Sequence, residues 1–156
     1  MAVLTGDKAP SFALYNTEKQ KITLEEQKGK NVLLLFFPLA FTSTCTAELC
    51  GVRDNIASYN AVNAVVFGIS VDSPQTLRKF REEQHFNFDL LSDFNKEVST
   101  KYGSLYETFG MEMKGVSKRS AFVIDKEGIV RYAEVLENAG QVPDFGKINE
   151  TLRSLN

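Results

Sequence analysis

The sequence contains no tryptophan, one histidine and only two cysteines among 156 residues. Structural zinc sites use four ligands, mostly cysteine and histidine. The single histidine, His85, lies far along the chain from both cysteines, and no C-x-x-C pair exists. We therefore expect no metal ion, and we interpret His85, which follows a predicted helix, as a surface or helix-capping residue.

Long hydrophobic segments are also missing. The longest apolar run, Val32 to Phe41, falls well short of the about 20 apolar residues that a membrane-spanning helix needs. The N-terminal MAVLTGDKAPSF lacks the features of a secretory signal. These absences predict a cytoplasmic protein without a membrane partner. In that compartment two cysteines are more often reactive thiols than a permanent disulfide.

Charge is balanced and dispersed along the chain. The 18 basic and 20 acidic residues give a net charge of −2, and no basic block indicates a nucleic-acid partner. Hydrophobic residues make up 43% of the chain and charged residues 24%, which is typical of a globular protein and excludes disorder. The length predicts a single domain over residues 1–156.

The apolar pattern predicts an α/β protein. NVLLLFF (31–37) and AVVFGIS (64–70) are continuous apolar runs, typical of strands buried on both faces. A shorter strand is predicted at 88–93, an early hairpin around 12–24 and a late hairpin from 119–125 and 129–135. Helices are predicted at 45–59, 74–84, 95–103 and 143–155. This order favours a mixed central sheet flanked by helices, with an N-terminal hairpin.

Two local features refine this prediction. Ser73 and Pro74 suit the N-cap and first position of the helix that follows the strand 64–70. Residues 104–118, SLYETFGMEMKGVSK, have no clear period and are interpreted as a long loop or lid. We interpret the methionines and aromatics of this segment as loop packing and not as a cofactor site.

Both cysteines lie in FFPLAFTSTCTAELCG, residues 36–51. Cys45 is predicted in the first turn of the helix after the strand 31–37. The unpaired N–H groups and the positive dipole end there stabilise a thiolate. Ligands also bind at the carboxyl ends of strands in open α/β sheets. The position of Cys45 therefore favours a reactive thiol.

Cys50 follows Cys45 by five residues. On an intact helix this spacing separates the Cα atoms by roughly 8.5 Å, whereas disulfides need about 4.4–6.8 Å. A disulfide between them would require the helix to unwind. The alternative is that Cys50 is a small buried apolar residue, and the spacing leaves both open. It does not fit a C-x-x-C redox motif, which argues against a general thiol–disulfide oxidoreductase.

Four further residues are candidates to assist a thiolate that attacks a peroxide. That displacement needs hydrogen-bond donors along the O–O axis and a positive charge. Thr42 precedes Cys45 by one helical turn and is a candidate donor, Arg119 a candidate cation, Glu48 its orienting partner, and Pro38 a cover for the pocket. Each also has a structural interpretation, as a helix cap, a solvated charge or a strand stop.

The motif PLAFTSTC (38–45) matches P-x-x-x-T-x-x-C, and the chain thereby resembles the peroxiredoxins. The segments GDKAPSF, GISVDSP and RSAFVIDKEG extend the resemblance over nearly the whole chain. It implies a thioredoxin-like fold and a thiol peroxidase without a cofactor. Cys45 resembles the peroxidatic cysteine that hydroperoxide oxidises to sulfenic acid. Thr42 and Arg119 resemble the peroxide-binding residues, and Pro38 the residue that shields the sulfenate.

Two subfamily resemblances lead to different recycling routes. Cys50 followed by GVRDN resembles the bacterioferritin comigratory protein group, some of which resolve the sulfenic acid with this cysteine. Recycling by thioredoxin or a glutaredoxin-like dithiol would follow. Glu48 resembles instead the one-cysteine alkyl hydroperoxide reductase E type, in which an external thiol reduces the sulfenic acid. The resemblance allows a monomer or a homodimer, and a non-catalytic redox sensor is the remaining alternative.

Overall fold

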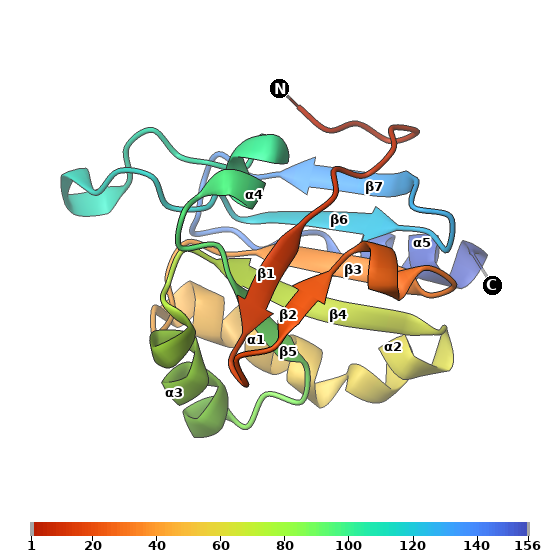
Figure 1. The fold of residues 1–156 in the computed structure, drawn as a ribbon, viewed down its shortest axis with the longest axis horizontal. Helices are drawn as coiled ribbons and strands as arrows, with labels where there is room; N and C mark the ends of the chain where they lie inside the picture. Colours follow the sequence, from red (N-terminus) through yellow and green to blue (C-terminus); the bar gives the residue numbers. More distant parts are fainter. Residues whose placement is uncertain (1, 156) are drawn as a thin grey trace.

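The computed structural model describes residues 2–155, which form a seven-stranded sheet with the order β2-β1-β5-β4-β3-β6-β7 (Figure 1). The strands β3, β4 and β5 are parallel, and the remaining neighbours pair antiparallel. The mixed sheet is therefore confirmed. The strands are β1 (Ala13–Asn16), β2 (Lys21–Thr23), β3 (Asn31–Phe36), β4 (Ala64–Ser70), β5 (Asp89–Ser92), β6 (Ser120–Ile124) and β7 (Val130–Val135).

Five α-helices and two short 3-10 helices lie in the described part of the chain. The 3-10 helices are η1 (Glu25–Gln27) and η2 (Gly110–Glu112). The α-helices are α1 (Ser43–Asp54), α2 (Ile56–Ala61), α3 (Pro74–Gln84), α4 (Glu97–Lys101) and α5 (Phe145–Ser154). None of these helices has the length and hydropathy to cross a membrane.

The strand β3 lies inside the sheet between β4 and β6, and all of its residues are buried. Side chains of this segment alternate between two core clusters, because successive residues of a strand point to opposite faces. One cluster contains Leu33, Leu35 and Phe37, and the other contains Val32, Leu34 and Phe36. This arrangement confirms the strand buried on both faces that the apolar run predicts.

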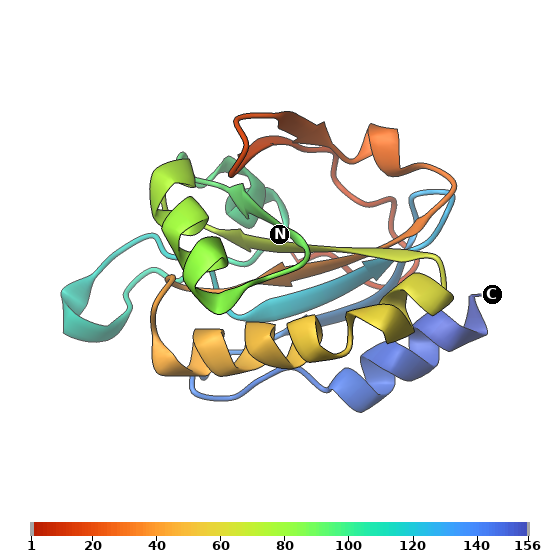
Figure 2. The same ribbon diagram turned by 90° about the horizontal axis from the view of Figure 1, so that it is seen from below.

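Different elements cover the two faces of the sheet. The first cluster is completed by apolar residues of α1, α2, α3 and α5, and Figure 2 shows α1, α2 and α5 along one face. The second is completed by Phe12, Leu14 and Leu24 of the N-terminal hairpin region and by Val98 and Tyr102 at α4. In Figure 2 the hairpin lies on the side opposite α1 and α5.

The prediction of one helix over residues 45–59 is wrong in its continuity. The helix is broken at Asn55 (φ −118°, ψ 17°), which separates α1 from α2. The Asn55 side-chain amide donates a hydrogen bond of 2.8 Å to the carbonyl of Gly51. Asparagine side chains compete in this way for backbone partners and favour helix ends. The apolar period continues through the break and hides it.

The boundaries of two other helices also differ from prediction. The predicted helix 95–103 is helical only over Glu97–Lys101, and Gly103 follows in a left-handed conformation (φ 66°). The closing helix begins at Phe145 and not at Pro143, because the Asp144 side chain accepts a hydrogen bond of 3.1 Å from the backbone N–H of Lys147. An N-cap of this kind fixes where a helix starts.

The helix α3 is capped as predicted at both ends. Ser73 Oγ accepts a 3.1 Å hydrogen bond from the backbone N–H of Thr76, and Pro74 is the first helical residue. His85 is exposed and ends the helix with a left-handed backbone (φ 54°). These positions confirm the interpretations of Ser73, Pro74 and His85.

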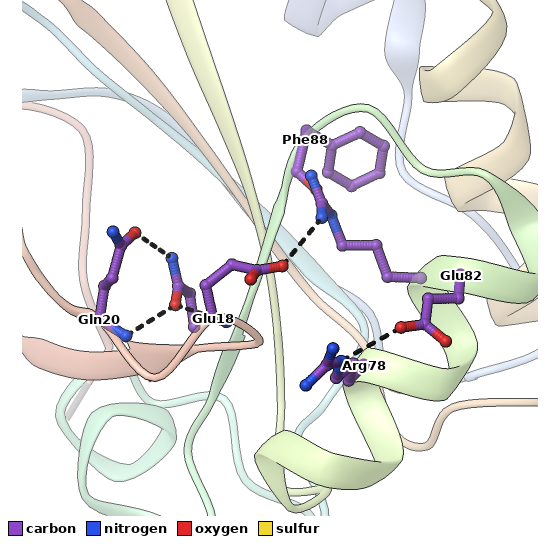
Figure 3. Close-up of polar contacts among 7 residues, drawn as sticks. Glu18, Gln20, Arg78, Glu82 and Phe88 are labelled. Carbon is purple, nitrogen blue, oxygen red and sulfur yellow. Dashed lines mark hydrogen bonds and ion pairs between the residues drawn. The ribbon is translucent and has the colours of Figure 1, made fainter.

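Polar contacts join the C-terminal half of α3 to the residue before β5 and to the turn between β1 and β2 (Figure 3). Arg81 Nε donates a 3.1 Å hydrogen bond to the carbonyl of Phe88, and Arg81 Nη1 lies 3.9 Å from Glu18 Oε1 in the turn between β1 and β2. Arg78 and Glu82 form an exposed pair on the same helix at 3.1 Å. Arg81 thus joins the end of α3 to two other segments of the chain.

Candidate active site

Cys45 is the third residue of α1 and is completely buried. The strand β3 ends at Phe36, and the connection to α1 brings the chain from the carboxyl end of this strand to the helix N-terminus. The predicted position in the first helical turn is confirmed. Both Cys45 and Cys50 are free thiols in this conformation.

Arg119 contacts three groups with one guanidinium. Its Nη2 lies 3.0 Å from Cys45 Sγ, and its Nη1 donates a 2.6 Å hydrogen bond to Glu48 Oε1. Its Nε donates a 2.9 Å hydrogen bond to the carbonyl of Ala139. The antiparallel pairing of Phe36 with Ser120 brings this end of β6 beside the start of α1. The structure thus places Arg119, Glu48 and Cys45 together.

Glu48 lies three residues after Cys45 on α1, where side chains share one face of a helix. Its Oε2 is buried without a hydrogen-bond partner. Burial raises the pKa of Glu48 to about 7, although the neighbouring Arg119 acts to lower it. Burial acts against the charge of Arg119, but Cys45 and Glu48 beside it raise its pKa overall, so the guanidinium stays charged.

The raised pKa of Glu48 predicts a pH-dependent stability. Its native pKa of about 7 exceeds the ordinary 4.5, so the native state binds a proton that the unfolded state does not, and stability rises as the pH falls through 7. Between pH 8 and 5.5 we expect a gain on the order of 2 kcal/mol in the free energy of unfolding. Denaturant unfolding of the reduced protein, followed by circular dichroism, measures it.

The Glu48→Gln variant tests whether this carboxyl causes the pH dependence, because glutamine has the shape of glutamate but does not titrate. The gain between pH 8 and 5.5 should then disappear, whereas Glu150→Gln, at an exposed position of α5, should keep it. An unchanged gain in Glu48→Gln would show that other groups cause the dependence.

Thr42 and Pro38 lie in the connection between β3 and α1. Thr42 is the N-cap residue of α1, and its Oγ1 donates a 2.8 Å hydrogen bond to the carbonyl of Leu39. The capping interpretation thus holds for its position, but its side chain does not cap the helix. Pro38 is buried. That the Thr42 hydroxyl faces the sulfur of Cys45 stays a prediction.

Asp72 holds the same connection and was not found from the sequence. Its Oδ2 accepts a 2.8 Å hydrogen bond from the backbone N–H of Ala40 and one of 2.7 Å from Ser70 Oγ at the end of β4. This carboxylate ties the segment before Cys45 to the sheet. Because 32 residues separate Asp72 from Ala40, no local spacing signals the contact. Local spacing likewise gives no sign that the Ala139 carbonyl accepts a hydrogen bond from Arg119.

The irregular segment 104–118 packs beside the site. Tyr106 and Phe109 stack with ring centroids 5.5 Å apart and join an apolar cluster that also contains Leu39 and Ala139. An open hollow of about 620 Å³ is bounded by this segment and by residues 137–140. Loop packing therefore describes the aromatics, but Met111 is 89% exposed and does not pack.

Cys50 is half-buried and packs against the core beneath α1. Its Sγ lies 3.5 Å from Gln84 Oε1 at the end of α3. It therefore faces a different neighbour from Cys45, as the helical spacing predicts. Within residues 2–155 no three His, Cys, Asp or Glu side chains cluster in a way that suits a metal ion.

Comparison with known proteins identifies the family. The model of the AhpC/TSA family matches residues 5–133. Alkyl hydroperoxide reductase E of Mycobacterium tuberculosis is 38% identical over 153 residues, which cover 96% of each chain. Peroxiredoxin Bcp of Escherichia coli is 36% identical over 129 residues, which cover 81% of this chain and 82% of the relative.

The fold agrees with these relatives. The crystal structure of peroxidoxin BcpB from Mycobacterium tuberculosis superposes with a TM-score of 0.87 at 29% identity and covers 99% of each chain. The predicted thioredoxin-like fold is thereby confirmed. The chain belongs to the AhpC/TSA family and is a peroxiredoxin enzyme.

Proposed function

We propose that Cys45 is the peroxidatic cysteine of this peroxiredoxin. Its sulfur attacks one oxygen of a hydroperoxide, the O–O bond breaks, and the other oxygen leaves as water or an alcohol after it takes a proton. Cys45 is left as a sulfenic acid. The observation that carries the proposal is the 3.0 Å contact between the Arg119 guanidinium and a completely buried Cys45 Sγ at a helix N-terminus.

The neighbouring residues are assigned from their positions. Arg119 holds the sulfur and stabilises negative charge on the peroxide oxygens. Glu48 is a positioning residue, because its 2.6 Å bond fixes the guanidinium. The sequence makes Thr42 a candidate donor, but its Oγ1 donates its proton to the Leu39 carbonyl in this conformation, so we assign its oxygen instead as an acceptor of a hydrogen bond from the peroxide. Pro38 is buried in the same connection and shields the sulfenic acid from water.

We further propose that Cys50 resolves the sulfenic acid. The Cys50 sulfur bonds to that of Cys45, and the hydroxyl leaves as water with the Cys50 proton. A dithiol of the thioredoxin or glutaredoxin type then reduces the disulfide. Support comes from the half-buried position of Cys50 on the same helix. In this proposal the chain acts as one thioredoxin-like domain in the cytoplasm, as monomer or homodimer, without a cofactor.

The alternative is a one-cysteine enzyme in which an external thiol reduces Cys45 directly. The packing of Cys50 against the core and Gln84 favours this second form, since it gives Cys50 a structural role. The Cys45–Arg119–Glu48 cluster is the same in both forms.

Intact-mass analysis after one equivalent of hydrogen peroxide, with a thiol-trapping reagent, tests these proposals. Resolution by Cys50 predicts a loss of about 2 Da with neither thiol trapped, as for a disulfide. A gain of about 16 Da with Cys50 still trapped indicates a stable sulfenic acid and a one-cysteine enzyme. The Cys50→Ser variant should show this gain in either case, and its absence would contradict the role of Cys45.

A further inference from the structure

Three polar contacts join the second half of α1 to Gln84 at the end of α3 and to Asn87 in the loop that follows. Cys50 Sγ contacts Gln84 Oε1 at 3.5 Å, and Arg53 Nη1 donates a 2.5 Å hydrogen bond to the backbone carbonyl of Gln84. The Asn87 side-chain amide donates a 3.2 Å hydrogen bond to the carbonyl of Arg53. We refer to Arg53, Gln84 and Asn87 as the α1 latch.

The residues that contact α1 in the latch belong to a segment that is itself held by other contacts. Arg81, one turn before Gln84, donates a hydrogen bond to the Phe88 carbonyl and lies 3.9 Å from Glu18. Phe86 and Phe88 on either side of Asn87 are buried in the core. The latch therefore ties α1 to a part of the molecule that need not move when α1 does.

A disulfide between Cys45 and Cys50 requires the helix between them to unwind, because an intact helix holds their Cα atoms roughly 8.5 Å apart. Only residues 51–54 then remain between Cys50 and the break at Asn55. That segment is one turn long, includes Gly51, and loses the carbonyl partners of its N–H groups when residues 47–50 unwind. Arg53 therefore leaves its helical position, and the latch opens.

We propose that the α1 latch is a brake on this unwinding and sets how long the oxidised Cys45 stays in its pocket. The inference rests on the proposed resolving role of Cys50. The sulfenic acid has two fates there. It condenses with the Cys50 thiol to the disulfide and water, or it reduces a second hydroperoxide to the alcohol or water and becomes a sulfinic acid.

The latch governs the ratio of these two products. A closed latch delays the disulfide without affecting the second oxidation, which needs only the folded pocket. A weaker latch shifts the product toward the disulfide. Arg53, Gln84 and Asn87 thus adjust the sensitivity of the enzyme to inactivation by excess peroxide, although none of them touches Cys45 in the structure.

The test uses Asn87→Ala and Arg53→Ala in the full chain. After a pulse of hydrogen peroxide, quenched-flow mass spectrometry should show disulfide forming roughly five- to tenfold faster, the range that one or two such hydrogen bonds support. The fraction of sulfinic acid at high peroxide should fall accordingly. The rate of the first oxidation should not change. Asn95→Ala and Arg153→Ala, at exposed positions outside α1 and the latch, are the matched controls.

Asn87→Ala decides the outcome, because it leaves Arg53 in place. The positive charge of Arg53 interacts with Asp54 and also with Cys50, and both raise the pKa of Arg53. Removing Arg53 therefore also removes its ion pair of 2.9 Å with Asp54, whereas removing the Asn87 amide does not. An unchanged or slower disulfide step in Asn87→Ala would overturn the brake.

Hydrogen exchange of the reduced proteins separates this inference from the proposed role of Cys50. Amides of α1 should exchange faster in Asn87→Ala than in the wild type, whatever Cys50 does. Faster exchange in Asn87→Ala without any disulfide would support the latch as a brake on unwinding and would contradict the resolving role of Cys50. A wild-type disulfide with unchanged exchange and rate in Asn87→Ala would keep the resolving role and overturn the brake.

Discussion

Cys45→Ser is expected to remove peroxide turnover entirely. A serine hydroxyl at this position stays protonated near pH 7 and is a poor nucleophile, so no group beside Arg119 can attack the O–O bond of a peroxide. The variant should fold, because serine has nearly the volume of cysteine and its hydroxyl can bond the guanidinium that now lies 3.0 Å from Sγ. Consumption of hydrogen peroxide in the presence of a dithiol measures the loss.

Cys50→Ser is the matched control, since it removes the other thiol from the same helix. It should still consume one equivalent of peroxide per chain and lose only the recycling by a dithiol. Residual turnover in Cys45→Ser above that of buffer would contradict the peroxidatic role. Equal steady-state turnover in Cys50→Ser and wild type would make the enzyme the one-cysteine type.

The parts of the fold that sequence reasoning captured depend on local or one-dimensional patterns. The run from Val32 to Phe37 has no polar residue, and such a run is stable as a strand only between two covered faces, as β3 is. Ser73 and Pro74 fix a helix start by contacts within one turn. The break at Asn55 was missed because its side chain competes with a helix that the apolar spacing otherwise favours.

The residues of the site also differ in how far the sequence reveals their contacts. Cys45 and Glu48 share a helix face, so their proximity follows from spacing alone. Arg119 is 71 residues from Glu48, and the sequence suggested their pairing only through the cation and the orienting partner that attack on a peroxide requires. Asp72 lies in the segment GISVDSP, which resembles the family, but no local spacing indicated its contact with Ala40 or the contact of the Ala139 carbonyl with Arg119. Contacts of this kind depend on how the ends of β3, β4 and β6 align, which the register determines and the pattern of one strand does not.

Arg119→Lys is expected to lower the rate constant for oxidation of Cys45 by hydrogen peroxide about 10²- to 10³-fold, the usual loss when a placed donor is removed from a reacting centre. The guanidinium reaches Cys45, Glu48 and the Ala139 carbonyl in three fixed directions. A lysine ammonium keeps the charge but is a single point at the end of a flexible chain, so it cannot hold all three. The chain has no tryptophan, so quenched-flow mass spectrometry is the suitable measurement.

A loss of folding must be distinguished from a loss of reactivity. Removing the guanidinium alone leaves the Glu48 carboxyl buried without its partner, and breaking a buried pair in this way typically costs about 3–5 kcal/mol of stability. The double variant Arg119→Met, Glu48→Gln removes both charges, so it should unfold near the wild type yet react at least as slowly as Arg119→Lys. Arg131→Lys, which alters a pair of 2.7 Å with Asp125 away from Cys45, should react normally. A double variant that folds and reacts at the wild-type rate would show that Arg119 serves stability and not peroxide chemistry.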